Sequence, residues 1–252
     1  MLIDTHCHIH ESYPLPLDEV LLRASEAQVH EYICVGTSEE SSRLAIAFAE
    51  EHPEAYAAIG VHPHDTKDGY AAISSLAGTS TKIVAVGEVG LDYFYGHSPR
   101  EVQLEALEAQ IQIAVKHDLP IIFHVREAFD DFWPIFDKYP GIRGELHSFT
   151  DSSENLQEAL KRGLYIGVNG ISTFTKDEVQ KKTFDSIPLD RLLFETDAPF
   201  LTPAPLRGKV NEPAYVKLVA EYHADRRGLS LEEISDATTA NARTLFHLTT
   251  LS

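Results

Sequence analysis

The chain of 252 residues has 39 acidic against 21 basic residues, and its formal net charge is −18 at pH 7. This balance argues against broad non-specific binding to duplex nucleic acid, but it allows a small cleft in which cations hold one or two phosphates. No apolar run reaches the roughly 18 residues of a membrane span, and no basic segment leads into an apolar one at the start. We therefore expect a soluble, cytoplasmic protein without a membrane partner.

Short apolar runs alternate along the chain with longer amphipathic runs, which is typical of βαβ units and a parallel sheet. The predicted strands are residues 2–5, 31–35, 56–60, 83–87, 121–124, 143–147, 164–168 and 192–196. The predicted helices are residues 17–28, 38–52, 68–79, 99–118, 129–138, 152–162, 175–185 and 212–226, followed by a further C-terminal helix at 230–246. Eight strands and eight helices predict one domain over residues 1–252, a TIM-type (β/α)8 barrel. A mixed α/β sandwich is the alternative.

Serine residues mark the starts of three of these helices. Ser38 precedes two glutamates, Ser98 precedes a proline and a glutamate, and Ser230 stands three residues before Glu233. Each serine is predicted to cap its helix, with Glu233 completing a capping box. Cys7 and Cys34 both fall in strand candidates and are expected in the core.

Metal-type ligands recur near the ends of the predicted strands. They are His6, His8, Glu88, His124, His147 and Asp197. A single histidine at a strand end is more often a hydrogen-bonding residue than a ligand, and Asp197 before Ala-Pro also suits a turn. Because active sites of this fold lie at the carboxyl ends of the strands, however, all six side chains are predicted to converge. Six nitrogen and oxygen ligands suit two divalent cations, one carboxylate bridging them, and hydrolytic chemistry.

At these residues the chain resembles the TatD family of metal-dependent deoxyribonucleases, within the amidohydrolase-like superfamily. The matching segments, in chain order, are residues 4–8, 60–64, 87–92, 120–124, 147–149, 187–203, 211–213 and 241–242. The neighbours of two ligands depart from the pattern, since Val125 follows His124 and Ser148 follows His147. These departures leave the tuning of the ligands and the substrate preference open.

The resemblance implies a somewhat distorted barrel with a two-metal phosphodiesterase site. In that site His6, His8 and Asp197 hold one ion, His124 and His147 hold the other, and Glu88 bridges them. The implied activity is removal of nucleotides from the 3′ end of single-stranded DNA. We expect the ions to be Mg²⁺, Mn²⁺ or Zn²⁺ and the protein to be a monomer. Glu88 and Asp197 are the catalytic candidates, with Asp197 orienting the attacking water or accepting its proton.

Several residues beside these ligands are candidates for contact with substrate. They are His62, His64, Arg126, Arg207 and Tyr93. The histidines and arginines suit a phosphate, and the loop from Tyr93 to Tyr95 suits either stacking of an unpaired base or packing over the barrel. Glu195 receives no role.

Two other functions remain open at this stage. The first is an amidohydrolase-like enzyme that cleaves a lactone, an amide or another small ester with the same metal pair. The second is a non-catalytic scaffold that keeps the barrel, against which the complete set of ligands argues.

Overall fold

A computed structural model describes residues 1–248. Its strands are β1 (Leu2–Cys7), β2 (Val29–Val35), β3 (Ala55–Ile59), β4 (Ile83–Asp92), β5 (Ile121–Arg126), β6 (Gly144–Leu146), β7 (Tyr165–Val168) and β8 (Leu192–Phe194). Their order in the sheet is the order of the chain, from β1 to β8. A parallel bridge from Cys7 to Ala198 links β1 to the segment after β8. All eight predicted strands are present, and the predicted (β/α)8 class is confirmed.

Helices separate the strands along most of the chain. The α-helices are α1 (Leu17–Glu26), α2 (Glu39–Glu51), α3 (Ile73–Leu76), α4 (Arg100–His117), α5 (Phe129–Phe136), α6 (Ser153–Lys161), α7 (Ile171–Phe174), α8 (Glu178–Asp185), α9 (Val216–Arg227) and α10 (Leu231–Phe246). Three 3₁₀-helices accompany them, η1 (Thr66–Asp68), η2 (Leu189–Arg191) and η3 (Pro213–Tyr215). The additional C-terminal helix is therefore confirmed as α10.

Two short helices differ from the prediction. The long helix predicted at 68–79 is wrong, since only α3 forms there as a single turn. Gly69 and Gly78 flank it with φ of 111° and 84°, which a helix cannot contain. The helix α7 was not predicted, because four residues are too few to show a periodic pattern.

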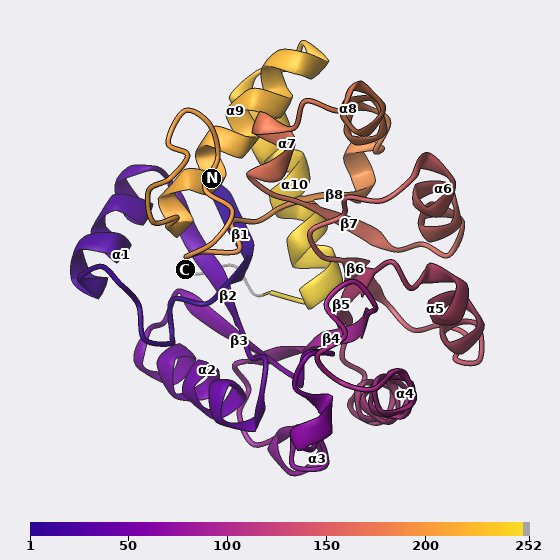
Figure 1. Cartoon of the computed structure of the whole chain (residues 1–252). Helices are drawn as coiled ribbons and strands as arrows, with labels where there is room; N and C mark the ends of the chain where they lie inside the picture. The colour runs from indigo at the N-terminus through magenta and orange to yellow at the C-terminus, as the bar shows by residue number, and fades with distance from the viewer. Residues whose placement is uncertain (249–252) are drawn as a thin grey trace. The chain divides into compact units, whose positions relative to one another are not determined.

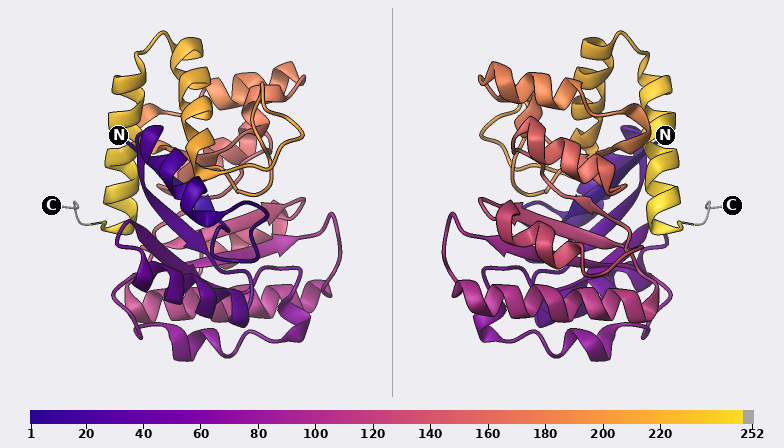
Figure 2. Two further views of the ribbon diagram at one scale, coloured as in Figure 1. Left: turned by 90° about the vertical axis from the view of Figure 1, so that its left-hand side faces the viewer. Right: turned by 90° about the vertical axis from the view of Figure 1, so that its right-hand side faces the viewer.

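The chain divides into two compact units, and the first comprises residues 1–34 and 148–248. In it β7 pairs with β8 and β1 with β2, all parallel, and β1 contacts β8. The helix α10 packs along β1, and Thr239 Oγ1 donates a hydrogen bond to the carbonyl of Met1 at 2.9 Å. Figure 2 shows this long helix beside the start of the chain in both views.

The second unit comprises residues 35–147 and contains β3, β4, β5 and β6, each paired in parallel with the next. The helix α2 packs on β3 and α4 packs on β4, and both lie outside the strands in Figure 1. Buried aromatic rings of Phe123 and Phe132, 5.0 Å apart, fix α5 against β5. Each unit therefore presents the ends of four parallel strands.

The helix caps agree with the sequence in two of three cases. Ser38 accepts from the backbone N–H of Ser41, and Ser230 forms the complete capping box with Glu233. The Ser98 prediction is wrong, because α4 begins one residue later than its Ser-Pro signal indicates. Ser98 Oγ instead donates to the carbonyl of His64 at 2.6 Å.

Cys7 and Cys34 are fully buried, as predicted. Within residues 1–248, every helix is too short or too polar to traverse a lipid bilayer. That residues 1–252 form a single domain stays a prediction.

Candidate metal centre

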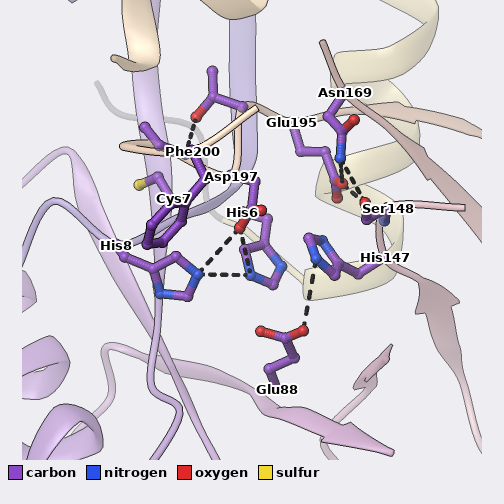
Figure 3. A network of polar contacts seen from close by, with 12 residues as sticks. His6, Cys7, His8, Glu88, His147, Ser148, Asn169, Glu195, Asp197 and Phe200 are labelled. Atoms are coloured by element: carbon purple, nitrogen blue, oxygen red, sulfur yellow. Dashed lines mark hydrogen bonds and ion pairs between the residues drawn. The ribbon is translucent and has the colours of Figure 1, made fainter. Parts of the chain in front are cut away.

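The first unit brings together His6, His8 and Asp197, which we call the first ligand set. His6 Nε2 and His8 Nε2 lie 3.2 Å apart, His6 within β1 and His8 directly after its end. Asp197 Oδ1 lies 3.3 Å from His8 Nε2 and 3.8 Å from His6 Nε2 (Figure 3). The predicted grouping of these three residues is therefore present in the structure.

Backbone bonds hold the first ligand set in register. The N–H of Asp197 donates to the carbonyl of His6, and the N–H of His8 donates to the carbonyl of Ala198, both at 2.8 Å. Beneath them Asp4, which is fully buried, accepts from the N–H and the hydroxyl of Thr196 at 2.8 and 2.6 Å. Burial raises the pKa of Asp4 to about 8, against the effect of these hydrogen bonds. Asp4 thus fixes the backbone beside Asp197.

The second unit brings three imidazoles onto one oxygen of Glu88. His124 Nδ1, His62 Nε2 and His147 Nε2 lie 2.8, 3.4 and 3.6 Å from Glu88 Oε1. Glu88 is buried within β4, which continues five residues beyond its predicted end at Gly87, and is not in a loop. We call Glu88, His124 and His147 the second ligand set.

A carboxylate not predicted to act at the site, that of Asp92, orients His124. Asp92 Oδ2 lies 3.0 Å from His124 Nε2 and 3.0 Å from His64 Nε2, and Asp92 Oδ1 accepts from the N–H of Tyr95. Burial alone raises the pKa of Asp92, but these hydrogen bonds outweigh it and the net pKa is lowered. An ionised Asp92 keeps the proton of His124 on Nε2, so Nδ1 is the atom that can ligate a metal.

His62 has the opposite arrangement of its two nitrogens. The backbone N–H of His64 donates to His62 Nδ1 at 3.2 Å, so the proton of a neutral His62 lies on Nε2, facing Glu88. Burial lowers the pKa of His62 and favours this neutral form, although the charge of Glu88 opposes it. A neutral His62 thus offers an N–H towards Glu88, and its contact with substrate stays a prediction.

The donor chemistry of both sets fits a divalent cation. The ligand atoms of His6, His8 and Asp197 all lie within 4.8 Å of one another, and so do those of Glu88 and His124 together with His62. A mixture of imidazole nitrogen and carboxylate oxygen at this spacing suits Zn²⁺, Mn²⁺ and related ions. Both units therefore contain groups that could hold a divalent cation, and the assignment of individual ligands stays a prediction.

Glu195, to which the sequence assigned no role, holds a loop of the first unit. Its Oε1 accepts from the N–H of Ser148 at 2.8 Å and from Asn169 Nδ2 at 3.1 Å (Figure 3). Ser148 has a φ of 49° and needs such support. Glu195 thus ties the residues after β6 and β7 to β8.

The remaining predicted substrate residues lie in different surroundings. Tyr93 donates its hydroxyl to Asp131 at 2.6 Å, and the Arg207 guanidinium stacks 3.6 Å over the ring of Phe174. Arg126 is exposed and stacks on Phe94, and His64 is hydrogen-bonded to Asp92. Their contacts with substrate stay predictions.

The family model described as TatD related DNase matches residues 3–247. The chain belongs to the TatD family. The metal-dependent hydrolase YabD of Bacillus subtilis (strain 168) is 42% identical over 98% of this chain and 100% of its own length. The 3′-5′ ssDNA/RNA exonuclease TatD of Citrobacter rodentium (strain ICC168) is 38% identical over 92% of each chain. The crystal structure of the TatD homolog YjjV of Escherichia coli K12 is 31% identical and matches with a TM-score of 0.90 over 98% of each chain.

These similarities confirm the predicted family and the predicted enzyme class. The chain is a metal-dependent hydrolase of the TatD family, a class that acts on ester bonds. The contributions of Asp4, Asp92 and Glu195 were missed, because each acts through a hydrogen bond that only the folded chain creates. Their one sequence signal is position, since each lies two to four residues from a predicted ligand.

Proposed function

We propose that the chain is a 3′-to-5′ exonuclease that hydrolyses the terminal phosphodiester of single-stranded DNA with divalent cations. The observation that carries the proposal is the arrangement of three imidazoles around Glu88 Oε1, all within 3.6 Å. The likeness to the exonuclease TatD of Citrobacter rodentium supports the choice of nucleic acid as substrate.

In this proposal each ligand set holds one cation. His6, His8 and Asp197 hold the first ion, and His124 and His147 hold the second together with Glu88. That Glu88 also bridges to the first ion stays a prediction from the family resemblance. Bound divalent cations lower the pKa of a water and offset the negative charge that develops on the phosphate oxygens.

The protein's own side chains supply proton transfer and orientation. Asp197 is the least buried member of the first ligand set, with its side chain 16% exposed, so it can reach a water. We assign it the role of orienting that water and accepting its proton. His62 directs its Nε2 proton towards the second set and can donate it to a phosphate oxygen.

A 5′-labelled single-stranded oligonucleotide tests the proposal. Metal-loaded protein is expected to shorten it from the 3′ end in a ladder that EDTA abolishes. Glu88→Gln is expected to lower the rate by on the order of 100-fold or more and to reduce the bound metal, whereas Glu50→Gln, an exposed carboxylate of α2, changes neither. A matched RNA strand measures the preference between the two nucleic acids.

The alternative of a small-ester or amide substrate has its own outcome. If oligonucleotides are inert with Mg²⁺, Mn²⁺ and Zn²⁺ while a lactone or amide is hydrolysed, the exonuclease proposal is refuted. The metal assignment would survive that result if Glu88→Gln still lowers the metal content.

A further inference from the structure

Two neighbouring aromatic rings face solvent in the turn after β4. Phe94 and Tyr95 are 51% and 52% exposed, and their rings meet edge to face with centroids 4.8 Å apart. Isolated exposed apolar side chains are common on proteins. Two adjacent, mutually packed rings beside a predicted metal ligand are a more specific feature.

The turn holds these rings in place by backbone hydrogen bonds. The N–H of Tyr93 donates to the carbonyl of Arg126 at 3.1 Å, and the N–H of Tyr95 donates to Asp92 Oδ1 at 3.0 Å. Tyr93 itself is anchored through its hydroxyl to Asp131. The turn therefore anchors Tyr93 and leaves Phe94 and Tyr95 exposed to solvent. These two rings suit base stacking better than Tyr93 does.

A cation lies against both rings. The guanidinium carbon of Arg126, an exposed residue, is 3.9 Å from the centroid of Phe94 and 4.9 Å from that of Tyr95. A guanidinium that stacks through its face can still donate hydrogen bonds from its N–H edge to a phosphate. Phe94, Tyr95 and Arg126 form what we call the aromatic platform.

One carboxylate joins the aromatic platform to the second ligand set. Asp92 accepts from the N–H of Tyr95 through Oδ1 and binds His124 and His64 through Oδ2. The ring of His64 also packs against that of Tyr95, with centroids 5.3 Å apart. The platform is thus placed relative to His124 through one short hydrogen-bonded path.

We infer that the aromatic platform binds an unpaired base close to the scissile phosphate, and that Arg126 binds a neighbouring phosphate. This inference rests on the proposed exonuclease function and adds to it the means of selecting single strands. A base inside a duplex has both faces stacked on its neighbours, whereas a base of a single strand can lie on these rings without unstacking a duplex. In a chain of net charge −18, local stacking supplies affinity that a basic surface would otherwise provide.

Binding of two oligonucleotides to the metal-loaded protein tests the platform. Both carry a 5′ fluorophore and phosphorothioate 3′ linkages that resist hydrolysis, and one has abasic sugars at its last three positions. The wild type is expected to bind the normal strand more tightly. Phe94→Leu and Tyr95→Leu should each weaken that binding roughly tenfold and leave the abasic strand unaffected. Arg126→Gln should reduce the slope of log Kd against log salt by about 0.7.

Control variants alter comparable exposed side chains of the same unit. Leu44→Ala and Lys116→Gln should bind both strands as the wild type does. The platform is refuted if the wild type binds the two strands equally, or if Phe94→Leu and Tyr95→Leu leave the affinity for the normal strand unchanged. If the wild type cleaves oligonucleotides but Phe94→Leu and Tyr95→Leu bind the normal strand as tightly as it does, the exonuclease function stands and the platform is refuted. Base-dependent binding that Phe94→Leu and Tyr95→Leu weaken, without a 3′ ladder, would keep the platform and refute the exonuclease. The absence of both binding and a ladder would refute both.

Discussion

Substituting Gly90 by alanine tests how the backbone positions His124. The two residues are register partners in β4 and β5. A Cβ built on Gly90 would lie 1.7 Å from the carbonyl oxygen of His124 and 2.7 Å from its carbonyl carbon. Real Cβ atoms do not approach backbone atoms closer than 3.0 Å, so the two strands must separate by about 1.3 Å at this point.

This displacement has consequences for stability and for rate. Forcing a methyl group into packed backbone costs about 1–3 kcal/mol of folding free energy. His124 carries one of the imidazoles of the second ligand set, and a misplacement of about 1 Å lowers enzymatic rates by roughly 100-fold. We therefore expect Gly90→Ala to lower metal affinity and kcat more than a loss of stability alone explains.

Urea unfolding, titration with Zn²⁺ against a chelator, and the oligonucleotide assay measure the three effects. The matched control is Gly141→Ala, at a φ of 87°, where an added Cβ meets no atom of residues 1–248 within 4 Å. It should cost about 1 kcal/mol of stability through its backbone conformation and leave metal affinity unchanged. Wild-type metal affinity in a folded Gly90→Ala variant would refute the reasoning.

Three further predictions concern side chains. Asp92→Asn removes the charge that orients His124, so Zn²⁺ affinity measured by chelator competition should fall roughly 10- to 100-fold; an unchanged affinity would contradict this role. Burial lowers the pKa of His223 to about 3 from 6.5, so its contribution to stability is complete above the unfolded pKa of 6.5 and is lost as the pH falls towards 3. Between about pH 7 and about pH 5, the free energy of unfolding measured in urea should fall by about 2 kcal/mol less for His223→Gln than for the wild type. The control His30→Gln, at an exposed histidine, should show the same fall as the wild type. Ser230→Ala should cost about 1 kcal/mol through the lost capping box, and an unaltered urea midpoint would show that α10 does not need it.

Much of the fold was predictable because its signals are local. The apolar runs that become β1 to β8 are visible in the sequence, and parallel strands place their carboxyl ends at one edge. That rule predicted that the six ligands converge, and the family resemblance added the grouping of His6 with Asp197, 191 positions apart. Ser230 and Glu233 were equally readable, since a capping box lies within four residues.

The remaining features depend on contacts that the sequence does not display. The strand β4 extends through Glu88 to Asp92 because β5 offers it a partner as far as Arg126. The direction of the His62 proton follows from one backbone N–H, and the role of Asp92 follows from the nearness of His124. Such features belong to tertiary geometry, which strand and helix patterns do not specify.

The packing of α10 and β8 on β1 also sets the order in which the ligand sets can form during synthesis. Asp4 binds Thr196 across a separation of 192 residues, and Met1 binds Thr239 across 238. At typical rates of translation, roughly 10–40 s pass between the appearance of His8 and that of Asp197. The second ligand set lies between Glu88 and His147 and is complete before Asp197 is made. All residues of the second set are therefore made before the first set can be completed, because the first set needs Asp197 from the last quarter of the protein.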